Sequence, residues 1–228
     1  MNLSTLYKIL LEKYGHQGWW PLLELHEKGI NPTKSGSIRG YHPKDYSYPK
    51  TKDQQFEIIL GTILTQNTSW IQVEKVLINL KQLNSLSPDS ILNLDKEKLK
   101  QAIKPAGYFN QKSERIILLA KWFKELNHTP DRTELLSLKG VGPETADSIL
   151  LYAFKIPSFV VDTYTKRILT NLEIINEKEK YEKIQKLFHE FLPKDFKIYQ
   201  EFHALLVEHA KHFYLKKENW RKDFLKSQ

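Results

Sequence analysis

Two groups of residues have types and spacing that could do chemistry: a glycine turn at Gly140 and Gly142, and a carboxylate at Asp162. Glycine at both turn positions lets the backbone take positive φ and come close to a partner. A carboxylate can stabilise a developing positive charge and can accept a proton from an attacking water. The sequence therefore predicts a ligand-facing backbone turn, followed further along the chain by an acid–base group.

Short helices are expected to position these groups. The segment T-E-L-L-S-L before the turn reads as one helix, and Pro143 stands in the first turn of the next, where a helix accepts proline best. Apolar residues recur at helical spacing after it and stop before Pro157. The chain then runs extended through 159–161, and Asp162 is expected to cap a further helix. The pattern is helix, glycine hairpin, helix, extended segment, capped helix.

The stretch L-K-G-V-G-P-E-T-A followed by V-V-D-T-Y-T-K-R resembles the helix–hairpin–helix DNA glycosylases of the endonuclease III superfamily. The resemblance implies that Asp162 is the catalytic carboxylate and that the hairpin's backbone N–H groups hold a DNA phosphate. The hairpin residues are Leu138, Lys139, Gly140, Val141 and Gly142. Strand-cutting relatives carry a lysine two residues after the second glycine, and Glu144 occupies that position here. Because a Schiff base needs an amine, a monofunctional glycosylase is expected.

The resemblance also implies residues that handle a flipped base. Residues 53–66 predict an apolar helix capped by Asp53, which ends in T-Q-N-T-S-W. In the family a glutamine here fills the space left by the flipped base, so Gln66 is expected to do so; a plain helix cap is the alternative. An aromatic residue after this turn is typical of the 3-methyladenine glycosylases of endonuclease III type. That branch implies base stacking by Trp70, with Tyr48 as a second aromatic, whereas Trp70 could instead be a core residue.

Three further features carry alternatives. The segment G-Y-F-N-Q-K resembles a family element and implies a phosphate contact for Lys112, with a solvated lysine as the alternative. Residues 29–52 form a basic, tyrosine-containing loop that includes Lys34, and it either contacts DNA or packs onto the body of the protein. The adjacent Trp19 and Trp20 are expected in the core or in a rigid turn.

Composition narrows the class of protein. The chain has 228 residues, 40% apolar content and a net charge of +8, as expected for a globular nucleic-acid binder. It has no cysteine, which excludes disulfides, thiolate zinc sites and the iron–sulfur cluster of endonuclease III. His203, His209 and His212 do not share one helix face, so no metal site is expected. No cofactor is predicted, although a monovalent cation at the hairpin carbonyls is compatible with the resemblance.

The expected fold is all-α, with further helices over 3–14, 70–83, 88–103, 178–192 and 195–216. Ser87 and Asp95 mark two of the helix starts. The resemblance implies two lobes: a bundle over 50–156 with the wedge and hairpin, and a second lobe from 1–49 plus 157–228. Asp162 would stand in the cleft between them. No signal peptide or membrane span is evident, so a soluble cytoplasmic monomer is expected.

The function expected from these patterns is base excision repair on double-stranded DNA that contains damaged bases. The enzyme would flip the base and hydrolyse its N-glycosidic bond. An N3-alkylated purine such as 3-methyladenine is the favoured substrate, because it is cationic and aromatic rings attract cations. The alternatives are a glycosylase for oxidised or mismatched bases on the same scaffold, a non-catalytic hairpin module that binds DNA, and a structural helical protein.

Overall fold

The computed structural model describes residues 1–33 and 39–227, and every regular element in that part of the chain is helical. The α-helices are α1 (Leu3–Tyr14), α2 (Lys52–Leu64), α3 (Trp70–Gln82), α4 (Pro88–Asn93), α5 (Lys96–Ile103), α6 (Phe109–Glu125), α7 (Arg132–Ser137), α8 (Pro143–Ser148), α9 (Thr163–Asn171), α10 (Tyr181–Phe191) and α11 (Phe196–Phe213). A π-helix over Ile149–Ala153 continues α8. Short 3₁₀ helices cover Leu23–Lys28, Lys104–Ala106, Lys217–Lys222 and Phe224–Ser227. The all-α prediction is confirmed.

Side-chain caps explain where several helices begin. Ser87 and Asp95 cap α4 and α5 as predicted, since each accepts a hydrogen bond from a first-turn backbone N–H. The predicted cap of α2 at Asp53 is wrong. Thr51 caps this helix instead: its hydroxyl accepts from the Gln54 backbone N–H at 3.2 Å, and the Gln54 side chain accepts in return from the Thr51 N–H. This reciprocal pair places Asp53 inside the first turn.

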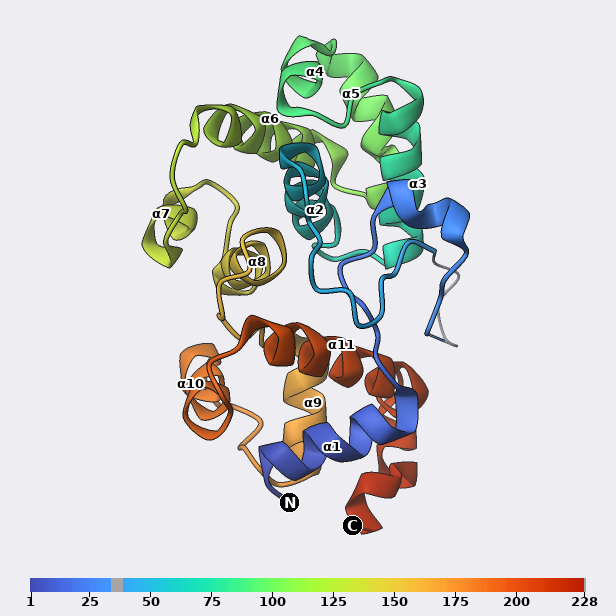
Figure 1. The fold of residues 1–228 in the computed structure, drawn as a ribbon, viewed down its shortest axis with the longest axis vertical. Helices are drawn as coiled ribbons and strands as arrows, with labels where there is room; N and C mark the ends of the chain where they lie inside the picture. Colours follow the sequence, from blue (N-terminus) through green and yellow to red (C-terminus); the bar gives the residue numbers. More distant parts are fainter. Residues whose placement is uncertain (34–38, 228) are drawn as a thin grey trace.

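The helices fall into two groups in space (Figure 1). Helices α2 to α6 lie together in one group, while α1, α9, α10 and α11 lie in the other, with α7 and α8 between them. Helix α2 is the central element of the first group and packs against α3, α6, α8 and the π-helix. In the second group α11 packs against both α1 and α9, so the first α-helix of the described chain lies beside the last α-helix. The lobe boundaries at residues 50 and 156 stay a prediction.

The loop before α2 packs onto the body of the protein through its tyrosines. Tyr41 and Tyr48 are buried, and the Tyr46 hydroxyl donates to buried Glu201 of α11 at 2.8 Å. This arrangement matches the packing alternative for residues 29–52. Lys34, part of the same predicted basic loop, lies outside the described residues. No helix in the described part of the chain is long and apolar enough to cross a bilayer.

Candidate active site

The glycine hairpin joins α7 to α8 as predicted, with the Val141 N–H donating to the Leu138 carbonyl at 3.0 Å. Its two glycines differ. Gly140 has φ +88°, and a Cβ there would lie 2.4 Å from the Arg115 side chain, so this position requires glycine. Gly142 has φ −95°, and its predicted positive φ is wrong. Nothing lies within 4 Å of a Cβ built on Gly142, which leaves the backbone open to a partner.

Gln66 follows α2 and joins it to the hairpin. Its amide nitrogen donates to the Gly140 carbonyl and to the Thr145 hydroxyl, both at 3.0 Å. Its amide oxygen accepts from the Arg115 guanidinium at 2.7 Å. Both N–H bonds of the amide are therefore used within the protein. To enter a DNA stack, Gln66 would have to exchange these contacts, and its wedge role stays a prediction.

Lys112 does not lie where a phosphate could reach it. The residue is 1% exposed, and its ammonium donates to the carbonyls of Leu64 and Ala106, each at 2.8 Å. Burial lowers its pKa to about 8. The predicted phosphate contact is thus wrong for this conformation, and so is the solvated alternative. Lys112 instead satisfies the carbonyl at the C-terminal end of α2 and ties α6 to it.

One carboxylate oxygen of Asp162 caps α9, and the other faces His203 of α11. Its Oδ1 accepts from the Thr165 backbone N–H at 2.7 Å and from the Thr165 hydroxyl at 2.8 Å. Its Oδ2 lies 3.9 Å from Nε2 of His203 on α11. The predicted cap is confirmed. The side chain is 15% exposed, so the free oxygen faces a restricted space rather than bulk water.

Glu144 stands on the first turn of α8, where the resemblance implies a lyase lysine in strand-cutting relatives. The residue is exposed, although protein lies close enough to its carboxyl to desolvate it in part. Desolvation, with the negative charge of Asp162 as the second cause, raises the pKa of Glu144 to about 7, while Lys166 opposes the shift. A carboxyl of this kind changes charge near neutral pH.

A group of rings extends from His203, the residue whose Nε2 lies 3.9 Å from Asp162. We call it the aromatic cluster, and its members are Trp19, Trp20, Trp70, Tyr152 and His203. The Trp20 ring centroid lies 5.2 Å from that of Trp70 and 5.2 Å from that of Tyr152. The His203 ring lies 5.7 Å from Trp19 and 5.9 Å from Tyr152. The cluster provides flat apolar surfaces next to a carboxylate.

The structure brings Trp70 into this cluster and places Tyr48 elsewhere. Trp70 is half-buried at the start of α3. Among the described residues, the ring partners of Tyr48 are His42, at 4.8 Å, and the Lys50 ammonium, at 4.3 Å. The prediction that Tyr48 lines the base pocket therefore has no geometric support in this conformation.

Sequence reasoning missed the remaining members of the cluster. For Trp20 the core prediction is confirmed: it is 7% exposed, and its indole lies against Gly61 of α2. Trp19 is only half-buried, and the W-W-P run was the one signal that could have raised it as a site residue. Tyr152 and His203 sit on ordinary buried helix faces, so no local pattern marks them.

Several polar atoms of the cluster are buried without partners. In the part of the chain that the structure describes, no hydrogen bond reaches Nε2 of His203 or the indole Nε1 of Trp19, Trp20 or Trp70. Buried polar atoms are nearly always paired in folded proteins, and exceptions need an explanation such as a ligand or an ordered water. These four atoms therefore mark a region where a partner from outside the chain would find hydrogen-bonding groups.

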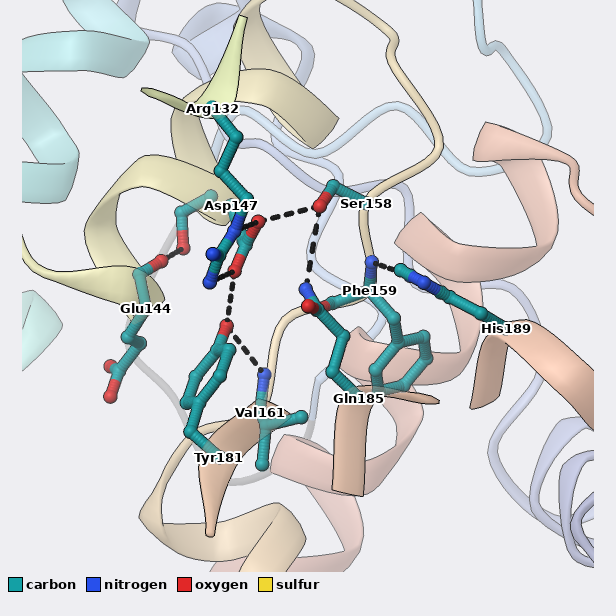
Figure 2. A network of polar contacts seen from close by, with 10 residues as sticks. Arg132, Glu144, Asp147, Ser158, Phe159, Val161, Tyr181, Gln185 and His189 are labelled. Carbon is teal, nitrogen blue, oxygen red and sulfur yellow. Dashed lines mark hydrogen bonds and ion pairs between the residues drawn. The ribbon is translucent and has the colours of Figure 1, made fainter. Parts of the chain in front are cut away.

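A second polar region fixes the extended segment that leads to Asp162 (Figure 2). Its centre is Asp147 of α8, which is fully buried and forms a two-pronged ion pair with Arg132 at 2.9 and 3.0 Å. Asp147 also accepts from the hydroxyls of Ser158 and Tyr181, at 2.5 and 2.8 Å. The Tyr181 hydroxyl in turn accepts from the Val161 backbone N–H at 3.4 Å. We call these residues the Asp147 network.

The rest of the segment is held from α10. Gln185 donates to the Phe159 carbonyl at 2.7 Å, and the Phe159 N–H donates to Nε2 of His189 at 3.0 Å. The side chain of Glu144 points away from the Asp147 network (Figure 2). Backbone and side chains on both sides of the segment therefore determine where Asp162 stands.

In the described residues, no group of three His, Cys, Asp or Glu side chains could hold a metal ion. At the hairpin, the carbonyls of Leu138 and Gly140 accept hydrogen bonds from Val141 and Gln66. Each carbonyl keeps a second lone pair, as a cation ligand requires, and the monovalent cation there stays a prediction.

Comparison with known proteins places the chain among DNA repair enzymes. The family model described as HhH-GPD superfamily base excision DNA repair protein matches residues 60–194. The protein named "Putative DNA repair glycosylase MJ1434" of Methanocaldococcus jannaschii is 44% identical over 227 residues, covering 94% of this chain and 90% of that protein. Endonuclease III of Buchnera aphidicola is 34% identical over 183 residues, covering 78% of this chain and 87% of that protein.

A solved structure extends the similarity to most of the fold. The H. pylori 3-methyladenine DNA glycosylase MagIII, bound to 1,N6-ethenoadenine, superposes with a TM-score of 0.69 at 26% sequence identity. The match covers 92% of this chain and 98% of that one.

Proposed function

The chain belongs to the HhH-GPD superfamily of base excision DNA repair proteins, and from that premise we propose that it is a monofunctional glycosylase for alkylated purines. The proposed reaction is hydrolysis of the N-glycosidic bond of a flipped base, with 3-methyladenine as the first substrate. Similarity to a solved 3-methyladenine glycosylase supports this choice of substrate.

The observation that carries the proposal is the position of Asp162 beside the aromatic cluster. Breaking an N-glycosidic bond builds positive charge on the sugar, which a nearby carboxylate stabilises. The Oδ1 atom is fixed by Thr165, so Oδ2 can face the reacting sugar without losing the helix cap. The cluster reaches Asp162 through His203, so a base held on this side of the cluster would have its glycosidic bond near Oδ2.

The proposed preference for alkylated purines follows from the aromatic rings of the cluster and the negative charges near them. A base alkylated at N3 is cationic, and stacked aromatic faces attract a cation most strongly when it is desolvated. Asp162, and Glu144 when ionised, add negative charge nearby. A charged base also leaves without a strong general acid, which agrees with a pocket whose histidine is buried and has a lowered pKa.

The absence of strand cleavage is proposed from Glu144 and from the placement of nearby amines. A carboxylate cannot form a Schiff base. Lys139 of the hairpin is exposed and lies 3.9 Å from Glu114, and the Lys155 ammonium donates to the Ser47 carbonyl at 2.6 Å. Lys112 is buried on two carbonyls.

For DNA binding we propose the hairpin, Gln66 and an additional residue, Tyr108. Open space above Gly142 suits a phosphate held by backbone N–H groups. Tyr108 is 66% exposed and has φ +47° at the start of α6. An exposed aromatic in a strained conformation fits stacking against a DNA base. The protein is expected to act as a monomer.

One observation favours a second substrate class. The indole N–H groups of Trp19 and Trp70 are buried without acceptors in the described part of the chain. Ring carbonyls, which oxidised or mismatched pyrimidines carry and 3-methyladenine lacks, would accept from them. The second candidate function is therefore a glycosylase for such bases on the same scaffold.

Measuring base release from a panel of DNA substrates distinguishes the two candidate functions. The full chain is incubated with duplex DNA that carries 3-methyladenine, oxidised pyrimidines or mismatched pyrimidines, and free bases are identified by chromatography. We expect alkylpurine release, an intact abasic strand and no adduct trapped by borohydride. Pyrimidine release without alkylpurine would support the second candidate, and a trapped adduct would contradict the monofunctional proposal.

A further inference from the structure

His203 has one ring nitrogen bound within the protein and the other facing Asp162. The residue is 5% exposed on α11, and its Nδ1 lies 2.7 Å from the hydroxyl of Tyr152 in the π-helix. Its Nε2 has no hydrogen-bond partner among the described residues and lies 3.9 Å from Oδ2 of Asp162. The Nδ1 side of the ring is therefore held by Tyr152, and the Nε2 side faces the proposed catalytic carboxylate.

The surroundings determine which nitrogen carries the proton. Burial lowers the pKa of His203, so its ring is neutral with a single N–H near neutral pH. The Asp162 carboxylate attracts that proton to Nε2, because an N–H facing a carboxylate is favoured over a lone pair facing it. Nδ1 then accepts from the Tyr152 hydroxyl, although the Gln200 carbonyl at 3.3 Å is a longer, competing acceptor for that hydroxyl.

The separation of the two facing atoms suits a shared water. At 3.9 Å, Nε2 and Oδ2 are too far apart for a direct hydrogen bond. A water oxygen about 2.8 Å from each atom would bridge this separation at ordinary hydrogen-bond lengths, and because Nε2 is closed to solvent in this structure, the water would enter together with the substrate. It would accept from Nε2–H and donate one hydrogen to Oδ2, which leaves a lone pair free.

We propose that His203 is a catalytic residue that holds the attacking water against Asp162, an inference that rests on the proposed glycosylase function. The water oxygen forms a bond to the anomeric carbon of the sugar as the N-glycosidic bond breaks. The electron pair of the broken bond leaves with the base. One water proton passes to Oδ2 of Asp162 and then to solvent, and His203 keeps its single proton throughout.

Tyr152 acts as a positioning residue for the histidine in this scheme. Its hydroxyl fixes the Nδ1 side of the ring, which keeps Nε2–H directed at the water. Because Tyr152 is buried and contacts Trp20, Tyr152→Phe keeps the packing while it removes the hydroxyl. We expect a smaller loss of rate for Tyr152→Phe than for His203→Ala.

The test measures single-turnover base release and the capture of the sugar by added methanol. For His203→Ala we expect a fall in rate of about 10²-fold, a much smaller loss of affinity for damaged duplex DNA, and a higher share of methyl glycoside over hydrolysed sugar. A disordered water loses its advantage over methanol, whereas a merely structural defect would not shift that ratio. His203→Gln keeps an N–H donor and should recover part of the rate and of the ratio.

Two controls keep the outcomes separate. His212→Gln changes a half-exposed histidine on the same helix, paired with Glu208 at 3.1 Å, and should leave both measurements unchanged. If wild type releases no base from any DNA, the proposed function fails and this inference fails with it. If wild type is active, Asp162→Asn is inactive, and His203→Ala retains the wild-type rate and methanol ratio, the role of His203 alone is overturned.

Discussion

The Asp147 network and the aromatic cluster are both buried polar regions next to Asp162, and they differ in how completely their polar atoms are paired. Both oxygens of Asp147 accept two hydrogen bonds each, from Arg132, Ser158 and Tyr181. In the cluster, the described structure leaves His203 Nε2 and the indole Nε1 of Trp19, Trp20 and Trp70 without partners. A buried unpaired group costs about 1–3 kcal/mol, so the cluster carries an energetic cost that the Asp147 network does not.

We interpret this difference as a division of roles: the Asp147 network holds the backbone in place, and the aromatic cluster binds a ligand. A saturated network has no capacity left for a ligand, and its bonds hold the segment before Asp162 in one place. The aromatic cluster is held by ring packing and by the hydrogen bond between Tyr152 and His203, and its unpaired polar atoms gain partners only when a ligand or water enters. The predictions below test whether stability belongs to the first region and substrate handling to the second.

The largest effect is expected for Asp147→Ala. Removing the carboxylate leaves the Arg132 guanidinium and two hydroxyls without their acceptor, which should reduce the free energy of unfolding by about 3 kcal/mol, since Arg132 is partly open to water. Chemical denaturation measures this loss. As a control, Glu97→Ala breaks the exposed pair with Lys100 and should change stability little. Equal losses for the two variants would contradict the structural role of Asp147.

Asp162→Asn should reduce base release by about 10²-fold or more, because the charge that stabilises the sugar cation is lost. The amide keeps an oxygen for the α9 cap, so folding and damaged-DNA binding should change little. Single-turnover kinetics and a binding titration on the same DNA measure the two. Near-normal turnover by the folded variant would remove Asp162 from the mechanism.

Trp70→Ala should lower both the rate and the selectivity between bases, since stacking contributes about 1–3 kcal/mol per base. Competition between alkylated and undamaged DNA shows the change in selectivity. Tyr48→Ala serves as the comparison, because its ring contacts are with His42 and Lys50 and lie apart from the cluster. A larger selectivity loss for Tyr48→Ala would reverse the assignment of the base pocket.

The smallest expected effect is a change in the pH dependence of the free energy of unfolding when Glu144 is replaced. Burial raises the pKa of Glu144 in the folded state to about 7, above its ordinary value of 4.5, so between these values the folded state binds more protons than the unfolded state. The free energy of unfolding therefore falls as pH rises through this window. Unfolding at pH 5 and pH 8 should show a smaller fall in Glu144→Gln than in wild type. Identical pH dependence in both would show that Glu144 titrates normally.

Local features of the fold could be predicted from the sequence. The helix starts at Ser87, Asp95 and Asp162 follow from side chains that cap their own first turn, and the hairpin follows from Gly140 and Pro143. The cap of α2 was misplaced because Thr51 and Asp53 are both good capping residues, and only the partner at Gln54 decides between them.

Features that depend on distant partners could not be predicted. Lys112 is buried because the carbonyls of Leu64 and Ala106 converge on it, and nothing adjacent in sequence indicates this. The aromatic cluster joins Trp19 near the start of the chain to His203 near its end. The resemblance to 3-methyladenine glycosylases predicted Trp70 as a site residue, whereas only the structure shows its contact with Trp20.

The pairing of α1 with α11 also determines the order in which the enzyme can mature during its synthesis. A growing chain releases the hairpin and Gln66 from the ribosome before α11 exists, and domains are built from the N-terminal end first. Until α11 emerges, α1 lacks its main packing partner and keeps only its smaller contact with α10, and Asp162 has no His203 facing it. A polypeptide terminated before α11 would contain the glycine hairpin and Asp162 but would lack His203.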